Sequence, residues 1–161
     1  MTHLSFPDLS GKLINLRELS MDDAITILNL MSYDISKYLY EVPYPYKIDD
    51  ALNFIKSSYE YFKLHKAITF GIEYKNTLES KLLLVGTISI KDIDYVNKKA
   101  NIGYWIGKQY QGKGIATECV ELVVNYAFDI LELEEISAYV FHDNNPSIRV
   151  LEKMGSLRRV R

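Results

Sequence analysis

A glycine-rich turn constrains this chain more than any other part of its sequence. The turn, Tyr110–Ala116, has the sequence YQGKGIA and lies between a predicted strand, Ala100–Ile106, and an amphipathic run, Thr117–Leu131. A glycine turn that opens a helix leaves several backbone N–H groups without partners, with the positive end of the helix dipole behind them. The turn therefore predicts a site for an anion, most simply a phosphate group.

The apolar pattern on either side of the turn predicts an α/β chain. Strands are expected at residues 13–16, 68–74, 82–90, 100–106 and 136–141, with a bulge at Gly86. Helices are expected after the capping box Ser20-x-x-Asp23, from Asp49 or Asp50 to near His65, at residues 117–131 and from Asn144 to Met154. An irregular loop at residues 33–46 and a hairpin loop at residues 92–99 complete the order.

The order of these elements predicts a mixed sheet with helices on both faces. Residues 68–106 form an antiparallel meander in this interpretation. The strands at residues 100–106 and 136–141 are joined by a helix, so we expect them to be parallel neighbours.

Composition indicates an ordinary globular protein. Of the 161 residues, 48% are hydrophobic and 25% are charged, so we expect a single domain over residues 1–161 whose core needs no metal or disulfide. Cys119 is the only cysteine, which excludes an intramolecular disulfide and fits a reducing cytoplasm. No signal peptide is apparent, and no apolar run approaches the roughly 20 residues of a membrane helix. We therefore expect a cytoplasmic protein with no membrane partner.

Charge and histidine spacing argue against other ligands. The formal net charge is −2 and the basic residues are scattered, which does not favour nucleic-acid binding. His3 and His65 are not spaced with His142 as metal ligands, so no metal site is expected.

Two phosphate-binding motifs overlap in the glycine turn. Residues 107–114 read GKQYQGKG, which departs from a P-loop at Gly114, where Ser or Thr would hold magnesium. The meander upstream is also not the βαβ organisation of a P-loop fold. The second motif, Q-x-x-G-x-A, is formed by Gln111, Gly114 and Ala116. A turn that merely caps a helix is the remaining interpretation.

The second motif is accompanied by others along nearly the whole chain. They are LREL at residues 16–19 followed by DDA at 22–24, VGTI at 85–88, NIGYWIG at 101–107, QGKGIATE at 111–118 and NNPSIRVLEKMG at 144–155. With these motifs the chain resembles the GNAT superfamily of acetyl-CoA-dependent N-acetyltransferases, and within it the ribosomal-protein-alanine (Rim-type) branch.

The resemblance implies acetyl-CoA as cosubstrate, with its pyrophosphate on the amides of the glycine turn. It implies that pantetheine pairs with the backbone of Tyr104, Trp105 and Ile106 where two strands splay, and that the N–H of Trp105 or Ile106 is the oxyanion donor. Lys113 either meets a phosphate or is solvated. The cofactor-binding residues implied by the resemblance are Gln111, Gly112, Lys113, Gly114, Ile115, Ala116, Thr117, Asn144 and Ser147, with Tyr104, Trp105 and Ile106.

The acid–base residues of this chain depart from the family pattern. Related sequences often carry a glutamate base where this chain has Asn101, and an amide cannot take a proton at neutral pH. The base is then elsewhere, is water, or is not needed. Glu41 is the best remaining carboxylate, against a solvated loop charge, and His142 is a further candidate against an ordinary loop histidine. Ser147 matches a position that can hydrogen-bond the thiol, against a hydroxyl in a first helical turn.

The expected reaction is direct attack of a primary amine on the thioester. An α-amine loses its proton about 2.5 pKa units more easily than lysine, roughly 3.4 kcal/mol, so an α-amine is the easier acceptor. A protein N-terminal α-amine and a small-molecule amine both stay open. The alternative is a catalytically weak or inactive acyl-CoA-binding module, motivated by Asn101 and by Leu151, which stands where many relatives place a tyrosine acid. Cys119 is expected in the core.

The end of the sequence adds an expectation about assembly. Relatives continue into two more strands after the position of Gly155, whereas few residues follow it here. We expect the C-terminal hairpin to be missing and the edge of the strand at residues 136–141 to be exposed. A second copy in a homodimer would cover that edge, or it stays open.

Overall fold

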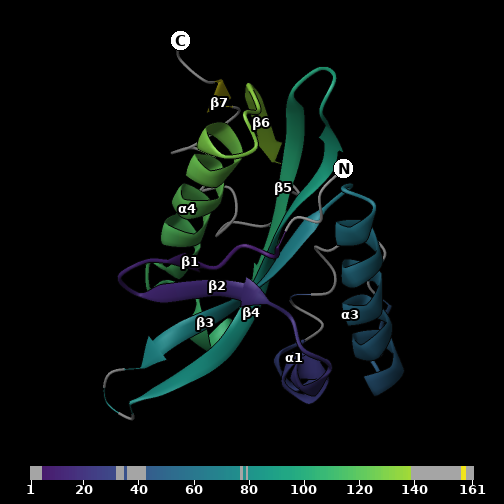
Figure 1. Ribbon diagram of the computed structural model, residues 1–161. Helices are drawn as coiled ribbons and strands as arrows, with labels where there is room; N and C mark the ends of the chain where they lie inside the picture. The colour runs from purple at the N-terminus through teal and green to yellow at the C-terminus, as the bar shows by residue number, and fades with distance from the viewer. Residues whose placement is uncertain are drawn as a thin grey trace.

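The chain builds one mixed sheet with helices against both faces (Figure 1). The computed structural model describes residues 5–31, 35, 43–76, 78, 80–138 and 157–158. The strands are β1 (Leu9–Ser10), β2 (Ile14–Glu18), β3 (Ile68–Asn76), β4 (Lys81–Asp94), β5 (Lys99–Ile106), β6 (Glu135–Ala138) and β7 (Leu157–Arg158). The helical segments are the 3-10 turns η1 (Met21–Asp23) and η2 (Lys108–Tyr110) and the α-helices α1 (Ala24–Leu30), α3 (Ile48–Lys63) and α4 (Ile115–Asp129).

The sheet follows the order of the chain, β1-β2-β3-β4-β5-β6-β7. Among the described pairs all are antiparallel except β5–β6. The parallel register aligns Lys99 with Glu135 and Ile102 with Ala138. A parallel pair needs a crossover connection, which α4 supplies. The predicted meander and the predicted parallel pair are both confirmed.

Each face of the sheet has its own core. On one face α4 buries Val123 against a cluster that includes Ile106. On the other, α1 and α3 bury Ile27 and Ile55 in a cluster that includes Trp105. Trp105 and Ile106 are neighbours in β5 but belong to different cores, because successive side chains of a strand point to opposite faces. The prediction of helices on both faces is confirmed, and Figure 1 shows α4 apart from α1 and α3.

A glycine inside a predicted strand indicates a bulge, and β4 has a bulge next to Gly86. Ile72 pairs with Gly86 and Glu73 pairs with Leu84, so Val85 is the extra residue in β4. The bulge turns the carbonyl of Val85 toward β5, where it accepts from the Gly107 N–H at 2.8 Å. The end of β5 is thereby fixed ahead of η2 and the glycine turn.

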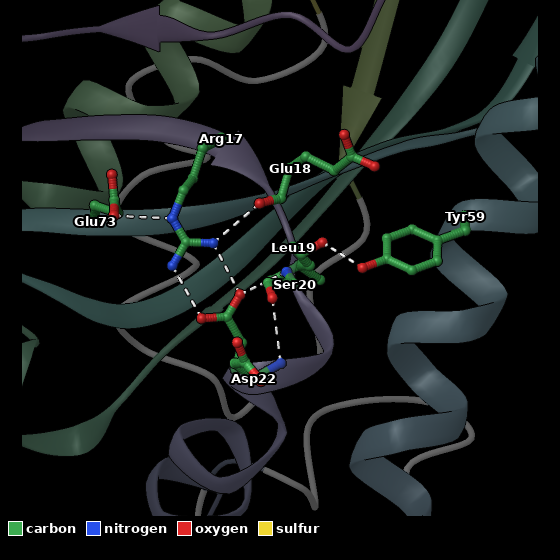
Figure 2. Close-up of polar contacts among 8 residues, drawn as sticks. Arg17, Glu18, Leu19, Ser20, Asp22, Tyr59 and Glu73 are labelled. Carbon is green, nitrogen blue, oxygen red and sulfur yellow. Dashed lines mark hydrogen bonds and ion pairs between the residues drawn. The ribbon is translucent and has the colours of Figure 1, made fainter.

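An ionic cluster fixes the start of α1 (Figure 2). The Arg17 guanidinium forms two hydrogen bonds to Asp23, at 2.8 and 2.9 Å, and its Nε lies 2.8 Å from Glu73. Asp23 Oδ2 also accepts from the Ser20 N–H at 2.7 Å, which completes the predicted capping box. Tyr59 donates to the carbonyl of Leu19 at 2.6 Å and attaches α3 to the same corner.

Several boundaries differ from the sequence-based expectations. β1 was not predicted, and β4 continues to Asp94, so the hairpin loop is shorter than residues 92–99. Ile35 is helical and buried beside α1 and α3, so the expectation of irregular chain is wrong at that residue. The helix predicted from Asn144 to Met154 lies outside the described residues.

The exposed edge predicted beside β6 is partly wrong. β7 pairs antiparallel with β6, aligning Leu157 with Ile136 and Arg158 with Glu135. These few residues form one short strand, as the length of the segment allows. Since part of the edge is already paired, it gives less reason for a homodimer, which stays a prediction.

In the part of the chain that the structure describes, no helix is long and apolar enough to cross a membrane.

Candidate functional site

The glycine turn forms a loop that is built to start a helix. Gly112 has φ +76° and Gly114, which caps the N-terminus of α4, has φ +82°. These left-handed conformations strain most residues with a Cβ, so glycine is favoured at both positions for a conformational reason. Among the described residues, no atom comes within 4 Å of the place of a side chain on Gly112, and near Gly114 only Leu13 does. A bulky group can therefore approach the backbone closely here.

A run of backbone donors is available at this turn. Within the described chain, the N–H groups of residues 112–117 donate to no protein acceptor, and residues 111–114 are exposed. The first intrahelical donor in this region is Glu118, whose N–H bonds the carbonyl of Gly114 at 3.2 Å. Unpartnered amides at the positive end of a long helix are suited to an anion. The anion site predicted from the sequence therefore has the required backbone geometry.

Gln111 organises the turn through its side chain. Its Nε2 donates to the carbonyl of Ile106 at 2.9 Å, and its own backbone N–H lies 3.3 Å from the carbonyl of Lys108. Gln111 therefore connects the start of the turn to the end of β5, and the unpartnered amides begin at Gly112.

The end of β5 presents its backbone groups in alternation. The Gly107 N–H points toward β4, where it bonds Val85. Successive N–H groups of a strand point to opposite edges, so Trp105 also directs its N–H toward β4, while Ile106 directs its N–H toward the β6 edge. The described pairing with β6 ends at Ile102 and Ala138. The splay predicted beyond this pair lies outside the described residues.

Asn101 brings a carboxylate that the sequence did not single out. Its side-chain Nδ2 donates to Asp92 Oδ2 at 3.0 Å. Asp92 lies in an irregular stretch of β4, between the pairs Lys91–Asn101 and Asp94–Lys99, and has φ +53°. Sequence reasoning missed Asp92 because only the register of β4 against β5 places it beside Asn101.

The same face of the sheet carries other polar groups. The side chain of Lys91 extends over Gly103, since a Cβ there would lie 3.0 Å from Lys91 Nζ. Thr69 and Ser89 share a hydrogen bond of 2.9 Å. This is the face on which Trp105 packs, so these groups lie on the side of the sheet opposite α4.

Other candidates from the sequence are placed differently or lie outside the described chain. Cys119 is 1% exposed on α4, and burial raises the pKa of its thiol. Its predicted place in the core is confirmed. Lys113 is exposed beside the free amides. Glu41, His142, Asn144 and Ser147 lie outside the described residues, and their roles stay predictions.

Comparison with known proteins identifies the family to which this site belongs. Residues 14–156 match the acetyltransferase (GNAT) domain. The chain belongs to the GNAT acetyltransferase family. The acetyltransferase is 33% identical over 150 residues to the uncharacterized N-acetyltransferase YoaA of Bacillus subtilis, covering 93% of this chain and 82% of that protein.

Two further relatives are named for particular acceptors. The spermidine N(1)-acetyltransferase of Escherichia coli is 26% identical to the acetyltransferase over 147 residues, covering 91% of this chain and 74% of that protein. The structure of RimL, a ribosomal L7/L12 α-N-protein acetyltransferase, in complex with coenzyme A has a TM-score of 0.79 and covers 92% of this chain and 83% of that one. At 16% identity, this likeness shows the fold alone.

The protein is therefore an acetyl-CoA-dependent N-acetyltransferase. Acetyl-CoA supplies an acetyl group activated as a thioester. The glycine turn fits the anionic part of this cosubstrate, because no described residue accepts from its amides or covers the backbone at Gly112.

Proposed function

We propose that the enzyme transfers acetyl to a primary amine by direct attack, and that its preferred acceptor is the α-amine of a peptide or protein N-terminus. The observation that carries the cofactor placement is the run of free amides at residues 112–117. These amides hold the pyrophosphate, with Gln111 keeping the turn against β5. The backbone at the end of β5 then holds the pantetheine arm.

Direct attack is favoured over a covalent enzyme intermediate because the single cysteine is not a suitable nucleophile. Cys119 is the only cysteine of the chain, and it is buried with a raised pKa. A thiolate nucleophile needs an exposed, electropositive environment, which Cys119 lacks. The acceptor nitrogen therefore forms the bond to the acetyl carbon as the C–S bond breaks, and a proton passes to the leaving sulfur.

The register of β5 supports one of the two expected oxyanion donors. Ile106 directs its N–H to the β6 edge, while Trp105 directs its N–H to β4. We assign the donor role to the Ile106 N–H. One preorganised donor of this kind contributes about 3–4 kcal/mol to stabilising the transition state.

Asp92 is the proposed base. Asn101 cannot accept a proton, but its amide holds Asp92 at 3.0 Å on the face opposite α4. Asn101 lies five residues before Ile106 in β5, roughly 16 Å along the strand, so a carboxylate there takes the amine proton through a chain of waters. In this proposal the pair Asn101 and Asp92 takes the place of the glutamate that related sequences often carry. The amide of Asn101 orients the carboxylate of Asp92.

The α-amine is favoured by its acidity. At neutral pH it is deprotonated far more often than a lysine or a polyamine nitrogen, by about 2.5 pKa units or roughly 3.4 kcal/mol relative to lysine. An enzyme with a single exposed carboxylate as base benefits most from such an acceptor. RimL is named for a protein α-amine and the spermidine enzyme for a polyamine, so an experiment has to compare these two kinds of acceptor.

A thiol-release assay with matched acceptors tests the proposal. One peptide has a free N-terminus and no lysine, the second is Nα-acetylated and contains one lysine, and spermidine is the third acceptor. The peptide with the free N-terminus should give the highest kcat/KM at neutral pH. A higher kcat/KM for the blocked lysine peptide or for spermidine would overturn the preference for α-amines. If none of the three acceptors supports thiol release, amine transfer itself is contradicted.

A further inference from the structure

Glu118 joins two distant parts of the chain. It lies in the first turn of α4, and its Oε1 accepts from the Leu13 N–H at 2.8 Å and from the Ile14 N–H at 3.3 Å. Leu13 is 105 residues away in sequence, in the turn between β1 and β2. We call residues 11–14 the N-terminal turn. A glutamate at the positive end of a helix is also favoured by the helix dipole.

Gly11 makes this contact possible. A Cβ on Gly11 would collide with the carboxylate of Glu118, so only glycine lets the carboxylate lie against the turn. The Gly11 N–H bonds the carbonyl of Ile14 at 2.8 Å, which closes the turn around the carboxylate. Lys75 of β3 secures the other side of the turn, because its Nζ donates to the carbonyl of Gly11 at 2.6 Å and its N–H to that of Leu13 at 2.9 Å.

The N-terminal turn lies beside the glycine turn. Leu13 Cδ1 is 3.7 Å from the place of a Cβ on Gly114 and, in the part of the chain that the structure describes, is the only atom within 4 Å of it. Leu13 is 37% exposed, and Lys12 next to it is exposed and has no ion pair in the described chain. The carboxylate of Glu118 therefore sets the position of an apolar side chain beside Gly114, and the exposed Lys12 precedes that side chain in the sequence.

We propose that Glu118 is a positioning residue for the CoA phosphates, which holds the N-terminal turn against Gly114. This inference rests on the proposed placement of the pyrophosphate at residues 112–117. Because the same helical turn carries the free amides and Glu118, occupation of the amides and order in the N-terminal turn are coupled. CoA binding should therefore protect the Leu13 and Ile14 amides, although they belong to a different element.

Three variants separate geometry from charge. Glu118→Ala removes both hydrogen bonds, while Glu118→Gln keeps an oxygen at the Oε1 position and loses the charge. Glu121→Ala is the matched control, since Glu121 is an exposed residue of the same helix with no bond in the described chain. The readouts are the Kd of CoA by calorimetry and hydrogen exchange at Leu13 and Ile14, with and without CoA.

Glu118→Ala should raise the Kd of CoA about five- to tenfold and abolish the CoA-induced protection at Leu13 and Ile14. Glu118→Gln should stay within about threefold of the original protein, and Glu121→Ala should be unchanged. An unchanged Kd and intact protection in Glu118→Ala would overturn the inference. A loss in Glu118→Gln as large as in Glu118→Ala would also overturn it, because the geometry would then not be the cause.

A fourth variant tests the phosphate placement separately. Ala116→Pro removes one free N–H from the second residue of α4, where no intrahelical bond is lost. If Ala116→Pro weakens CoA binding and Glu118→Ala does not, the placement stands and the role of Glu118 fails. If neither weakens binding, the placement itself is wrong and the inference fails with it.

Discussion

Gln111 donates its side-chain Nε2 to the carbonyl of Ile106 across 2.9 Å, so the first residue of the glycine motif is bonded to the last residue of β5. This hydrogen bond fixes the start of the loop against the end of β5. It thereby sets the position of the free amides relative to the strand that we expect to hold the pantetheine arm. The motif therefore connects the two segments to which we assign the cofactor.

Replacing Gln111 by alanine should raise the Kd of CoA several-fold, because loss of one hydrogen bond of about 0.5–1.5 kcal/mol loosens the turn. Gln111→Glu should be worse, since a carboxylate would meet the carbonyl of Ile106 and add negative charge near the phosphates. Gln109→Ala, an exposed neighbour, is the control. Calorimetric titration with CoA measures all three, and equal affinities would contradict the role of Gln111.

Replacing Gly86 by alanine should destabilise the fold by about 1–3 kcal/mol, because the new methyl group would overlap the backbone carbonyl of Trp105. Gly103→Ala is the matched change in the adjacent strand. There the nearest atom is the flexible end of Lys91, which can move aside, so its cost should be smaller. Urea unfolding of both variants measures the difference, and similar midpoints would refute the rigid contact at Gly86.

Asp23 should make stability depend on pH in the acid range. Burial opposes its ionisation, but hydrogen bonds from Arg17 and Ser20 together with the charge of Arg17 outweigh burial and lower the pKa of Asp23. A folded pKa below the unfolded value of about 3.9 means that the stabilisation is complete above that value. It is lost as the pH falls through the folded pKa.

The test compares the original protein with Asp23→Asn by thermal unfolding from about pH 7 down to about pH 2. Asp23→Asn should cost about 1–3 kcal/mol at neutral pH, since charged hydrogen bonds are lost. The difference in Tm should shrink below about pH 4. A difference that stays constant over the whole range would show that Asp23 does not act through its charge.

Asp92→Asn should lower kcat for the α-amine peptide about 10²-fold, the lower end of what a general base contributes, because this acceptor is already partly deprotonated. Asp94→Asn is the control, since Asp94 lies on the same hairpin and accepts from the N–H groups of Val96 and Asn97. If both variants retain full activity, water takes the proton and the role of Asp92 is refuted.

Cys119 should resist thiol reagents in the folded protein, because it is buried and burial raises the pKa of its thiol. Mass spectrometry after alkylation should find label only when urea is present. Cys119→Ala should retain transferase activity. Rapid labelling of the folded enzyme with loss of activity would instead point to a cysteine nucleophile.

Local patterns were enough to predict most of the architecture. The alternation in β3 and the glycine in β4 are local signals, and the structure confirms both the strand and the bulge at Gly86. The short strand β1 was missed because its two residues, Leu9 and Ser10, are too few to show an alternation of apolar and polar side chains. The end of β4 was missed because Asp92 and Asp94 look like turn residues, although the turn proper follows Asp94.

The site could be predicted only where it is made from one continuous segment. The free amides follow from the order of glycines in residues 110–116, whereas Asp92 and Glu118 act on residues that only the fold brings near them. Asp92 depends on the register of a hairpin, and Glu118 depends on a contact across most of the chain. The spacing of residues in one sequence predicts neither the contact of Asp92 with Asn101 nor that of Glu118 with Leu13.

The sheet follows the chain from neighbour to neighbour, and its parallel step between β5 and β6 contains the free amides. Hairpins close locally, but a crossover closes later, because a longer loop must be ordered first. A ligand at this point stabilises the native state alone, by about 2.7 kcal/mol when it is at a hundred times its Kd. The supply of acetyl-CoA would thus govern how long each enzyme molecule survives proteolysis as well as how fast it turns over.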